Sequence, residues 1–174
     1  NNDGVPTGID VEIATEAFHR MGYRAQFETI DWEKKTTLLE SSTIDCIWGC
    51  FSMDGREGLY RWAGPYMKSR EVVAVNVNSS IQSLADLAGK TIAVQTTSKP
   101  EGSFLSGADP RIPQVAEVFS MENRSVQYAM LTCGYVDAIA AHETAILQYM
   151  KDCNVEFRIL EEPLLVTGLG VAFA

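Results

Sequence analysis

The amino-acid sequence predicts an α/β protein of two lobes, each a mainly parallel sheet flanked by helices. Strand-like and helix-like hydrophobic patterns alternate twice over along the 174 residues, which is typical of sheets covered by helices. A β-branched run at Val72–Val77 separates the two series. The hydrophobic content of 46% and the charged content of 21% are ordinary for a globular protein. A chain of this length can bury a core as one domain or as two small lobes.

The first series begins with a helix whose apolar residues recur at helical spacing and which Gly22 ends. Residues 24–30 alternate as a strand, and a second helix follows over 33–41. Residues 44–48 then form a short buried strand. The strand at 72–77 is the crossover into the second series. The apolar positions of the first helix are Ile9, Val11, Ile13, Ala14, Ala17, Phe18 and Met21.

Helices and strands continue to alternate in the second series, and Gly89 ends the first of its helices. This regular alternation supports a second α/β unit. We expect helices over 79–87, 98–105, 122–132 and 142–152, and strands over 91–95, 115–119, 137–140, 155–159 and 169–173.

Composition excludes several classes of partner. The formal net charge is −9 and the isoelectric point is about 4.7, which argues against nucleic acid, because a phosphate backbone requires a basic face. No apolar run reaches the roughly 18 residues of a membrane-spanning helix, so we expect membrane attachment only through segments outside this chain. The four cysteines lack His or Cys neighbours at zinc spacing. We therefore expect no metal and no other cofactor.

A serine and an arginine that follow the strand at 44–48 are the strongest candidates for ligand binding. Ser52 and Arg56 lie in a polar turn just past the end of that strand, and small ligands bind at this edge of an open α/β sheet. A guanidinium there can grip a carboxylate through two parallel hydrogen bonds. An isolated arginine is more often a solvated turn residue, so the assignment depends on the surrounding motifs.

The motifs around Arg56 occur in a recognisable order that spans nearly the whole chain. They are Gly8–Glu12, Asp45, Gly49, Phe51–Ser52, Arg56, Trp62–Tyr66, Ser83–Lys90, Ala93–Ser98 and Gly134–Ile139. Together they resemble the signature of the bacterial extracellular solute-binding proteins of family 3, the amino-acid type. The resemblance implies the two-lobed fold of the type II periplasmic binding proteins. The loop before Arg56 is one residue shorter than the usual form.

The resemblance also implies how the lobes are connected. If the last strand returns to the first lobe, as in the family, the second lobe is an insertion, and two chain crossings form a hinge that lets the lobes close on a ligand. Family members begin with an earlier strand and continue past residue 174, so we expect a fragment or domain shortened at both ends. The expected boundaries are 1–75 plus 165–174 for lobe one, 77–163 for lobe two, and hinges near 75–77 and 162–166.

In lobe one the resemblance implies that Arg56 and the Ser52 hydroxyl hold a ligand carboxylate, helped by nearby backbone amides. Trp32 lies where the family often has an aromatic side chain that covers the ligand. A core or surface tryptophan at a helix start is an equal alternative. The expected ligand-binding residues of this lobe are Trp32, Gly49, Cys50, Ser52, Asp54 and Arg56.

In lobe two Thr97, Ser98 and Lys99 lie where a strand becomes a helix, and exposed amides at a helix N-terminus favour an anion. Ser98 as a plain N-cap is the competing interpretation, and both can hold. His142 stands where family members that bind free α-amino acids usually have an aspartate for the ammonium group. Either Glu143 takes over that role, or the ligand is not a standard amino acid, or the site has lost its ligand. A capping or surface histidine is a further alternative.

The sequence offers little for catalysis. Its two histidines are His19, inside the first amphipathic helix, and His142. There is no Gly-x-Ser-x-Gly motif, and His142–Glu143 lacks the second histidine of a zinc-protease helix. Residues 95–99 lack the glycines of a phosphate loop. We therefore expect a binding protein with no catalytic residues.

Three functions remain open. The variant segments around Arg56 and at 94–101 look most like the ligand-sensing domain of a membrane-anchored signalling protein, such as a diguanylate cyclase or a histidine kinase. The second function is a free solute-binding protein that serves an ABC permease, and the third is a cyclohexadienyl-dehydratase-like enzyme. The expected ligand is an amino acid or a related carboxylate, and the expected compartment is extracellular or periplasmic, with a membrane tether for the sensor.

A disulfide between Cys133 and Cys153 is a further expectation. These residues end the helices that enter and leave the strand at 137–140. Helices that flank one strand through right-handed crossovers lie on the same face of the sheet, so both thiols reach the same edge. An extracellular compartment allows the bond.

Overall fold

The computed structural model describes residues 5–174 and divides the chain into two compact units. Unit 1 consists of Asn1–Met67 with Gly168–Ala174, and unit 2 of Lys68–Thr167. The chain therefore passes from one unit to the other after Met67 and returns after Thr167. The hinges expected near 75–77 and 162–166 concern motion and stay a prediction.

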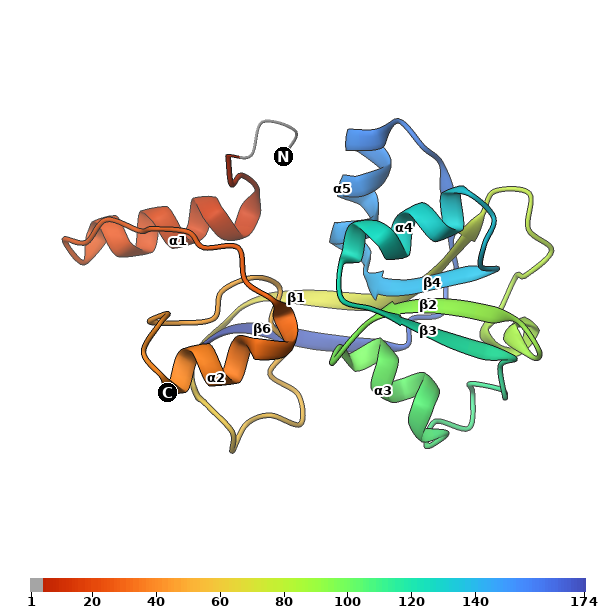
Figure 1. Ribbon diagram of the computed structural model, residues 1–174, viewed down its shortest axis with the longest axis horizontal. Coiled ribbons are helices and arrows are strands. Elements are labelled where there is room, and N and C mark those ends of the chain that lie inside the picture. The colour runs from red at the N-terminus through yellow and green to blue at the C-terminus, as the bar shows by residue number, and fades with distance from the viewer. Residues whose placement is uncertain (1–4) are drawn as a thin grey trace. The chain divides into compact units, whose positions relative to one another are not determined.

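Unit 1 contains few regular elements (Figure 1). Helix α1 begins after Gly8, whose φ of 110° is in the region that glycine favours. Its first turn carries two acidic residues and its last turn two basic ones, which complements the helix dipole. The elements that lie wholly or partly in unit 1 are α1 Ile9–Arg20, the 3-10 helix η1 Trp32–Lys34, α2 Lys35–Glu40, β1 Arg61–Asn76 and β6 Leu165–Phe173.

Two expected strands of unit 1 are not strands in the structure. Residues 24–30 belong to no strand, and of residues 44–48 only Ile47 forms a bridge, to Ala172. The predictions at these positions are wrong. An alternating pattern becomes a strand only when a neighbour completes the ladder of backbone hydrogen bonds, and within residues 5–174 no element does so for residues 24–30.

The core of unit 1 is a small aromatic cluster. Phe51 is 1% exposed, and the rings of Trp32, Tyr60 and Trp62 lie with their centroids 5.2–5.4 Å from that of Phe51. Leu39, Ile47, Phe51 and Ala172 are the buried members of this cluster. Helix α1 adds a single buried residue, Ala14.

Unit 2 follows the sequence prediction closely. Its strands and helices lie within about two residues of their expected bounds at most ends, although the helix expected over 79–87 shortens to a 3-10 turn. Arg158 holds the preceding loop open, since its guanidinium donates to the carbonyls of Ser79 and Ile81. The elements are η2 Leu84–Leu87, β2 Thr91–Gln95, α3 Lys99–Ser106, β3 Glu117–Met121, α4 Arg124–Thr132, β4 Ala138–His142, α5 Glu143–Cys153 and β5 Phe157–Ile159.

The strands form a mixed sheet in the order β3-β2-β4-β1-β5, and β6 also pairs with β1. Strand β2 is parallel to both β3 and β4, whereas β1 is antiparallel to β4 and β5. Two pairings set the register used below: Val94 lies beside Ala140, and Glu71 lies opposite His142.

Each face of the unit 2 sheet buries its own apolar cluster. Val73, Val94 and Ala140 face the side on which α3 places Phe104. Their neighbours along the strands face the other side, where α4 and α5 place Leu131 and Ile146. Figure 1 shows α4 and α5 together on one side of the sheet and α3 on the other. Continuous apolar strands are expected for a sheet that is covered on both faces.

The expected disulfide does not form, because the structure has all four cysteines free. Helices α4 and α5 do lie on the same face of the sheet, as the argument required. However, Cys133 and Cys153 are both exposed. The topology therefore supports the shared face, but both thiols are free and exposed to solvent.

Candidate ligand-binding site

In unit 1 the turn that follows Phe51 holds Arg56 in a defined position. The Arg56 Nη1 donates to the carbonyl oxygen of Ser52 at 3.1 Å, and the guanidinium carbon lies 5.0 Å from the centroid of the Phe51 ring. The backbone is fixed as well, since the Arg56 N–H donates to Met53 and the Trp62 indole donates to the Arg56 carbonyl. A cation over an aromatic face is stabilised electrostatically. Arg56 is thus half-buried and oriented, unlike a solvated turn arginine.

The backbone beside this turn is held by hydrogen bonds to Asp10, a residue that the sequence analysis did not select as a site residue. One Asp10 carboxylate oxygen accepts from the Cys50 N–H at 3.0 Å and from its Sγ at 3.3 Å. The other oxygen accepts from the Tyr66 hydroxyl at 2.7 Å. Burial, and then this hydrogen bond, raises the pKa of Tyr66 far above its usual range. The signal in the sequence was the motif Gly8–Glu12, which contains Asp10.

Trp32 belongs partly to the core. Its ring meets Phe51 edge-on with centroids 5.3 Å apart, and the Lys35 ammonium lies 5.0 Å from its centroid. The Lys35 Nζ also donates to the Trp32 carbonyl at 3.0 Å. Of the two roles weighed for Trp32, these contacts support the packing role, and they leave ligand contact a prediction.

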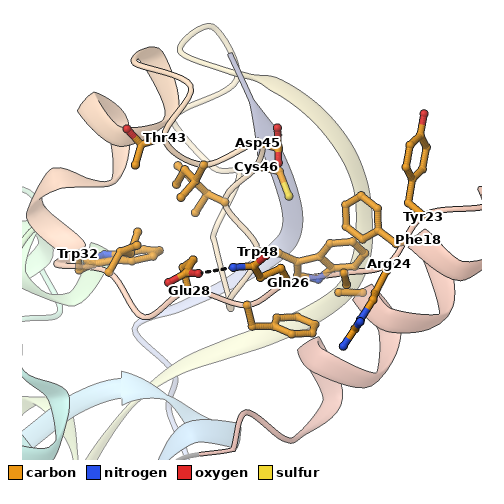
Figure 2. Close-up of a pocket in the computed structure, with 16 residues that line it drawn as sticks. Phe18, Tyr23, Arg24, Gln26, Glu28, Trp32, Thr43, Asp45, Cys46 and Trp48 are labelled. Carbon is orange, nitrogen blue, oxygen red and sulfur yellow. Dashed lines mark hydrogen bonds between the residues drawn. The ribbon is translucent and has the colours of Figure 1, made fainter.

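Unit 1 also contains a cavity of about 780 Å³. Figure 2 shows Phe18 and Trp48 along one wall, with the hydrogen-bonded pair of Gln26 and Glu28 beside them. Trp32 is the one expected ligand-binding residue that lines it. Within residues 5–174 the buried indole nitrogen of Trp48 has no hydrogen-bond partner. The cavity is thus separate from the turn that carries Ser52 and Arg56.

In unit 2 the junction of β2 and α3 brings Thr97, Ser98 and Lys99 together. Ser98 is the N-cap of α3, and its hydroxyl accepts from the Glu101 N–H at 3.3 Å. The Glu101 carboxylate in turn accepts from the Thr97 N–H at 2.7 Å. Ser98 therefore has the capping role that was weighed for it. The carboxylate of the chain's own Glu101 already binds at this helix start, where an external anion was expected.

His142 and Glu143 lie at the end of β4 and the start of α5. His142 is 6% exposed, which contradicts the surface alternative, and its side chain makes no capping bond. The imidazole contacts Ser69 and Glu71. Sequence reasoning missed both partners, because they precede the β-branched run at 72–77 that was expected to be the strand. Glu143 pairs with Arg70 at 3.1 Å.

The parallel pairing of β2 and β4 explains why these unit 2 residues gather. Carboxyl ends of neighbouring parallel strands meet at one edge of a sheet, and β2 ends at Gln95 beside β4, which ends at His142. Within the described part of the chain, no cluster of three or more His, Cys, Asp or Glu side chains could hold a metal ion. No helix of residues 5–174 is long and apolar enough to span a membrane.

The two α/β units and the polar edges they carry are those of a solute-binding protein. Residues 1–158 match the family model of the bacterial extracellular solute-binding proteins, family 3, and the chain belongs to this family. The fold is that of the type II periplasmic binding proteins. The family predicted from the motifs is therefore confirmed, and the further resemblance to signalling sensors stays a prediction.

Individual relatives bind amino acids. The L-cystine-binding protein TcyA of Bacillus subtilis (strain 168) is 30% identical over 146 residues, which cover 83% of this chain and 52% of that protein. The L-cystine-binding protein TcyJ of Escherichia coli (strain K12) is 25% identical over 174 residues, 98% of this chain and 64% of that protein. The chain thus spans about half to two thirds of the length of these relatives.

Solved structures of amino-acid-binding proteins have a similar fold. The crystal structure of Tv2483 bound to L-arginine superposes with a TM-score of 0.87 at 27% identity, covering 99% of this chain and 70% of that one. These relatives are ligand-binding proteins by name, and the chain belongs with amino-acid-binding solute-binding proteins.

Proposed function

We propose that this protein binds a free amino acid outside the cytoplasm and that Arg56 receives its α-carboxylate. The observation that carries the proposal is the orientation of Arg56 by Ser52 and Phe51. A guanidinium presents five N–H donors in a planar fork that matches a carboxylate. Because Phe51 fixes the plane of this fork and Ser52 fixes one edge, little side-chain entropy remains to be lost on binding.

The polar edge of unit 2 is the proposed partner for the rest of the amino acid. Its groups include a buried carboxylate, Glu71, and the hydroxyl groups of Thr97 and Ser98. This assignment is supported by the names of the relatives, which bind L-cystine or L-arginine. All of these ligands carry an α-carboxylate and an α-ammonium group. A guanidinium suits the carboxylate of such a ligand, and a carboxylate suits its ammonium group.

The proposed biological role is delivery of the amino acid to an ABC permease. A further solved relative is the substrate-binding protein of an amino-acid ABC transporter, with a TM-score of 0.81 at 26% identity. The sensor of a membrane-anchored signalling protein is the second candidate, favoured by the segments Gly55–Glu57 and 94–101 of the sequence. The full-length gene product separates the two: a spanning helix with a cytoplasmic signalling domain favours sensing, and a lipobox with neighbouring permease genes favours import.

The test is a thermal-shift screen of the twenty amino acids and L-cystine, followed by calorimetry on whatever stabilises the protein. Arg56→Ala should then cost about 2–5 kcal/mol of binding free energy, the usual loss when a buried charged partner is left unpaired. Arg20→Ala, which removes an exposed arginine of α1, is the matched control. Unchanged affinity of Arg56→Ala would remove Arg56 from the site. Turnover of prephenate or arogenate would instead favour the dehydratase.

A further inference from the structure

The imidazole of His142 is held between two side chains of β1. The Nδ1 atom lies 2.9 Å from the Ser69 hydroxyl, and Nε2 lies 3.1 Å from a carboxylate oxygen of Glu71. The side chains of His142 and Glu71 are only 7% and 4% exposed. Ser69 and Glu71 are two positions apart on β1 and therefore share one face of the sheet. Glu71 is also directly opposite His142 in the strand register.

A different pair of charges lies on the other face of β1. Arg70 stands between Ser69 and Glu71, so its side chain leaves the opposite face. It donates to the Glu143 carboxylate at 3.1 Å and to the Glu161 carbonyl at 2.6 Å. The carboxylate that shares a face with His142 is consequently that of Glu71, whereas the carboxylate of Glu143 serves Arg70.

Two further charged side chains of unit 2 have hydrogen-bond partners of their own. Glu101 accepts from the Thr97 N–H, and Arg124 donates to the Gln95 side chain. The buried hydroxyl of Thr96, which follows β2, has no hydrogen-bond partner within residues 5–174. Histidine is the side chain that changes its charge between about pH 5 and 8. The charged residue in contact with the His142 imidazole is Glu71 of β1, while the next charged residues along the chain, Arg70 and Glu143, pair with each other.

Both protonation states of His142 keep its contacts with Ser69 and Glu71. With a neutral imidazole, Nε2–H donates to Glu71 and the Ser69 hydroxyl donates to Nδ1. With a protonated imidazole, Nδ1–H donates to the Ser69 oxygen instead, and only the hydroxyl hydrogen turns. The pair of His142 and Glu71 therefore carries a net charge of −1 or 0 with the same heavy-atom positions.

We propose that the Glu71–His142 pair of unit 2 is an ammonium-binding site for the amino acid, and that protonation of His142 switches the charge of this pair off and weakens binding of the ligand's ammonium group. This inference rests on the proposed function, because it names the group that meets the ammonium. It assigns that role to Glu71, held through His142, in place of Glu143. A low external pH then lowers ligand affinity without any change in the fold.

The test is calorimetry with L-cystine and L-arginine between pH 5.0 and 8.5. In the wild type, affinity should rise by up to about tenfold per pH unit on the acid side and level off above, since binding excludes one proton. Glu71→Gln should bind weakly at every pH, and His142→Gln should lose the pH dependence. Glu143→Gln should keep the pH dependence, as should Glu117→Gln, which removes an exposed carboxylate of β3. A flat wild-type profile, or a slope that survives in His142→Gln, overturns the proposal.

A second measurement uses the unmodified protein and does not depend on ligand. The sequence has two histidines, so ¹⁵N spectra of the imidazoles resolve His142 from the exposed His19 once His142→Gln assigns them. The Nε2 of His142 should carry hydrogen throughout, and Nδ1 should gain it as pH falls. A His142 that keeps one charge from pH 5.0 to 8.5 overturns the switch whether or not a probe binds. A titrating His142 with no binding by any amino acid overturns the proposed function instead.

Discussion

The two units of this protein differ in what holds them together. Unit 2 buries an apolar cluster on each face of one sheet, with helices over both. Unit 1 depends on a small cluster of aromatic rings around Phe51, and half of the residues of α1 and most of residues 21–29 are exposed. Burial of apolar area is the main stabilising contribution in folding. The comparison indicates that unit 2 is the stable half and that the turn with Arg56 stands on the weaker one.

Hydrogen exchange should show the largest difference between the units. Residues 92–94 lie in the middle of the sheet with side chains fully buried, whereas residues 24–30 are in no ladder. Local opening costs nearly nothing in such segments and up to the full unfolding free energy in a central strand. We expect protection factors that differ by at least about a thousandfold, measured by mass spectrometry of peptides. Equal protection would contradict the contrast between the units.

A matched pair of isoleucine substitutions tests the contrast by stability. Ile146 of α5 is fully buried in unit 2, and Ile9 of α1 is 52% exposed in unit 1. Ile146→Ala should lower the free energy of unfolding by about 2–5 kcal/mol through lost burial and a cavity. Ile9→Ala should change it by less than about 0.5 kcal/mol. Urea unfolding measures both, and a costly Ile9→Ala would mean that α1 is bound more firmly than its exposure indicates.

Unit 1 nevertheless has one tightly packed point, at Gly170 of β6. A Cβ atom there would lie 2.7 Å from the Met53 sulfur and 2.8 Å from the Trp62 ring. Gly170→Ala should cost about 1–3 kcal/mol, because these neighbours must move. Gly102→Ala in α3 has open space around it and should gain up to about 1 kcal/mol from helix propensity. Thermal unfolding of the two variants gives the comparison, and a harmless Gly170→Ala would show that unit 1 repacks freely.

The smallest expected effect is a change in the stability of unit 2 at acid pH. Hydrogen bonds from the Gln82 and Ser83 N–H groups, and then from the Ser83 hydroxyl, lower the pKa of Asp86. A carboxyl whose pKa is lower in the folded state contributes stability above its unfolded pKa and loses it as pH falls through the folded value. Asp86→Asn should therefore narrow the stability difference between pH 7 and pH 3. Unfolding midpoints at the two pH values measure it, with the exposed Glu117→Gln as control.

The same difference between the units explains which helices and strands could be predicted from the sequence. Unit 2 strands such as 91–95 were predicted at their true positions because their apolar runs pack within the described chain. Residues 24–30 carry an equally clear alternation but are no strand, since a pattern cannot report whether a neighbour is present to pair with it. The helix expected over 79–87 failed for another reason. Arg158, distant in sequence, takes the carbonyls of the loop that precedes η2.

Candidate site residues could be named from the sequence where a local motif contains them. They could not be named where their role depends on a contact with another strand. Arg56 and Ser98 could be found from local motifs. The contact between His142 and Glu71 depends on the antiparallel register of β1 and β4, which no local pattern specifies. Sequence reasoning therefore named Glu143, the adjacent acidic residue, as one of several alternatives and did not single out Glu71, which the sheet places opposite His142.

The chain enters and leaves unit 2 at neighbouring positions on paired strands. The Glu71 carbonyl accepts from the Leu164 N–H at 2.8 Å, three residues inside the points at which the chain enters and leaves this unit. A segment of one hundred residues thus starts and finishes side by side, on paired strands. Only two junctions need to match for such a segment to be exchanged between genes.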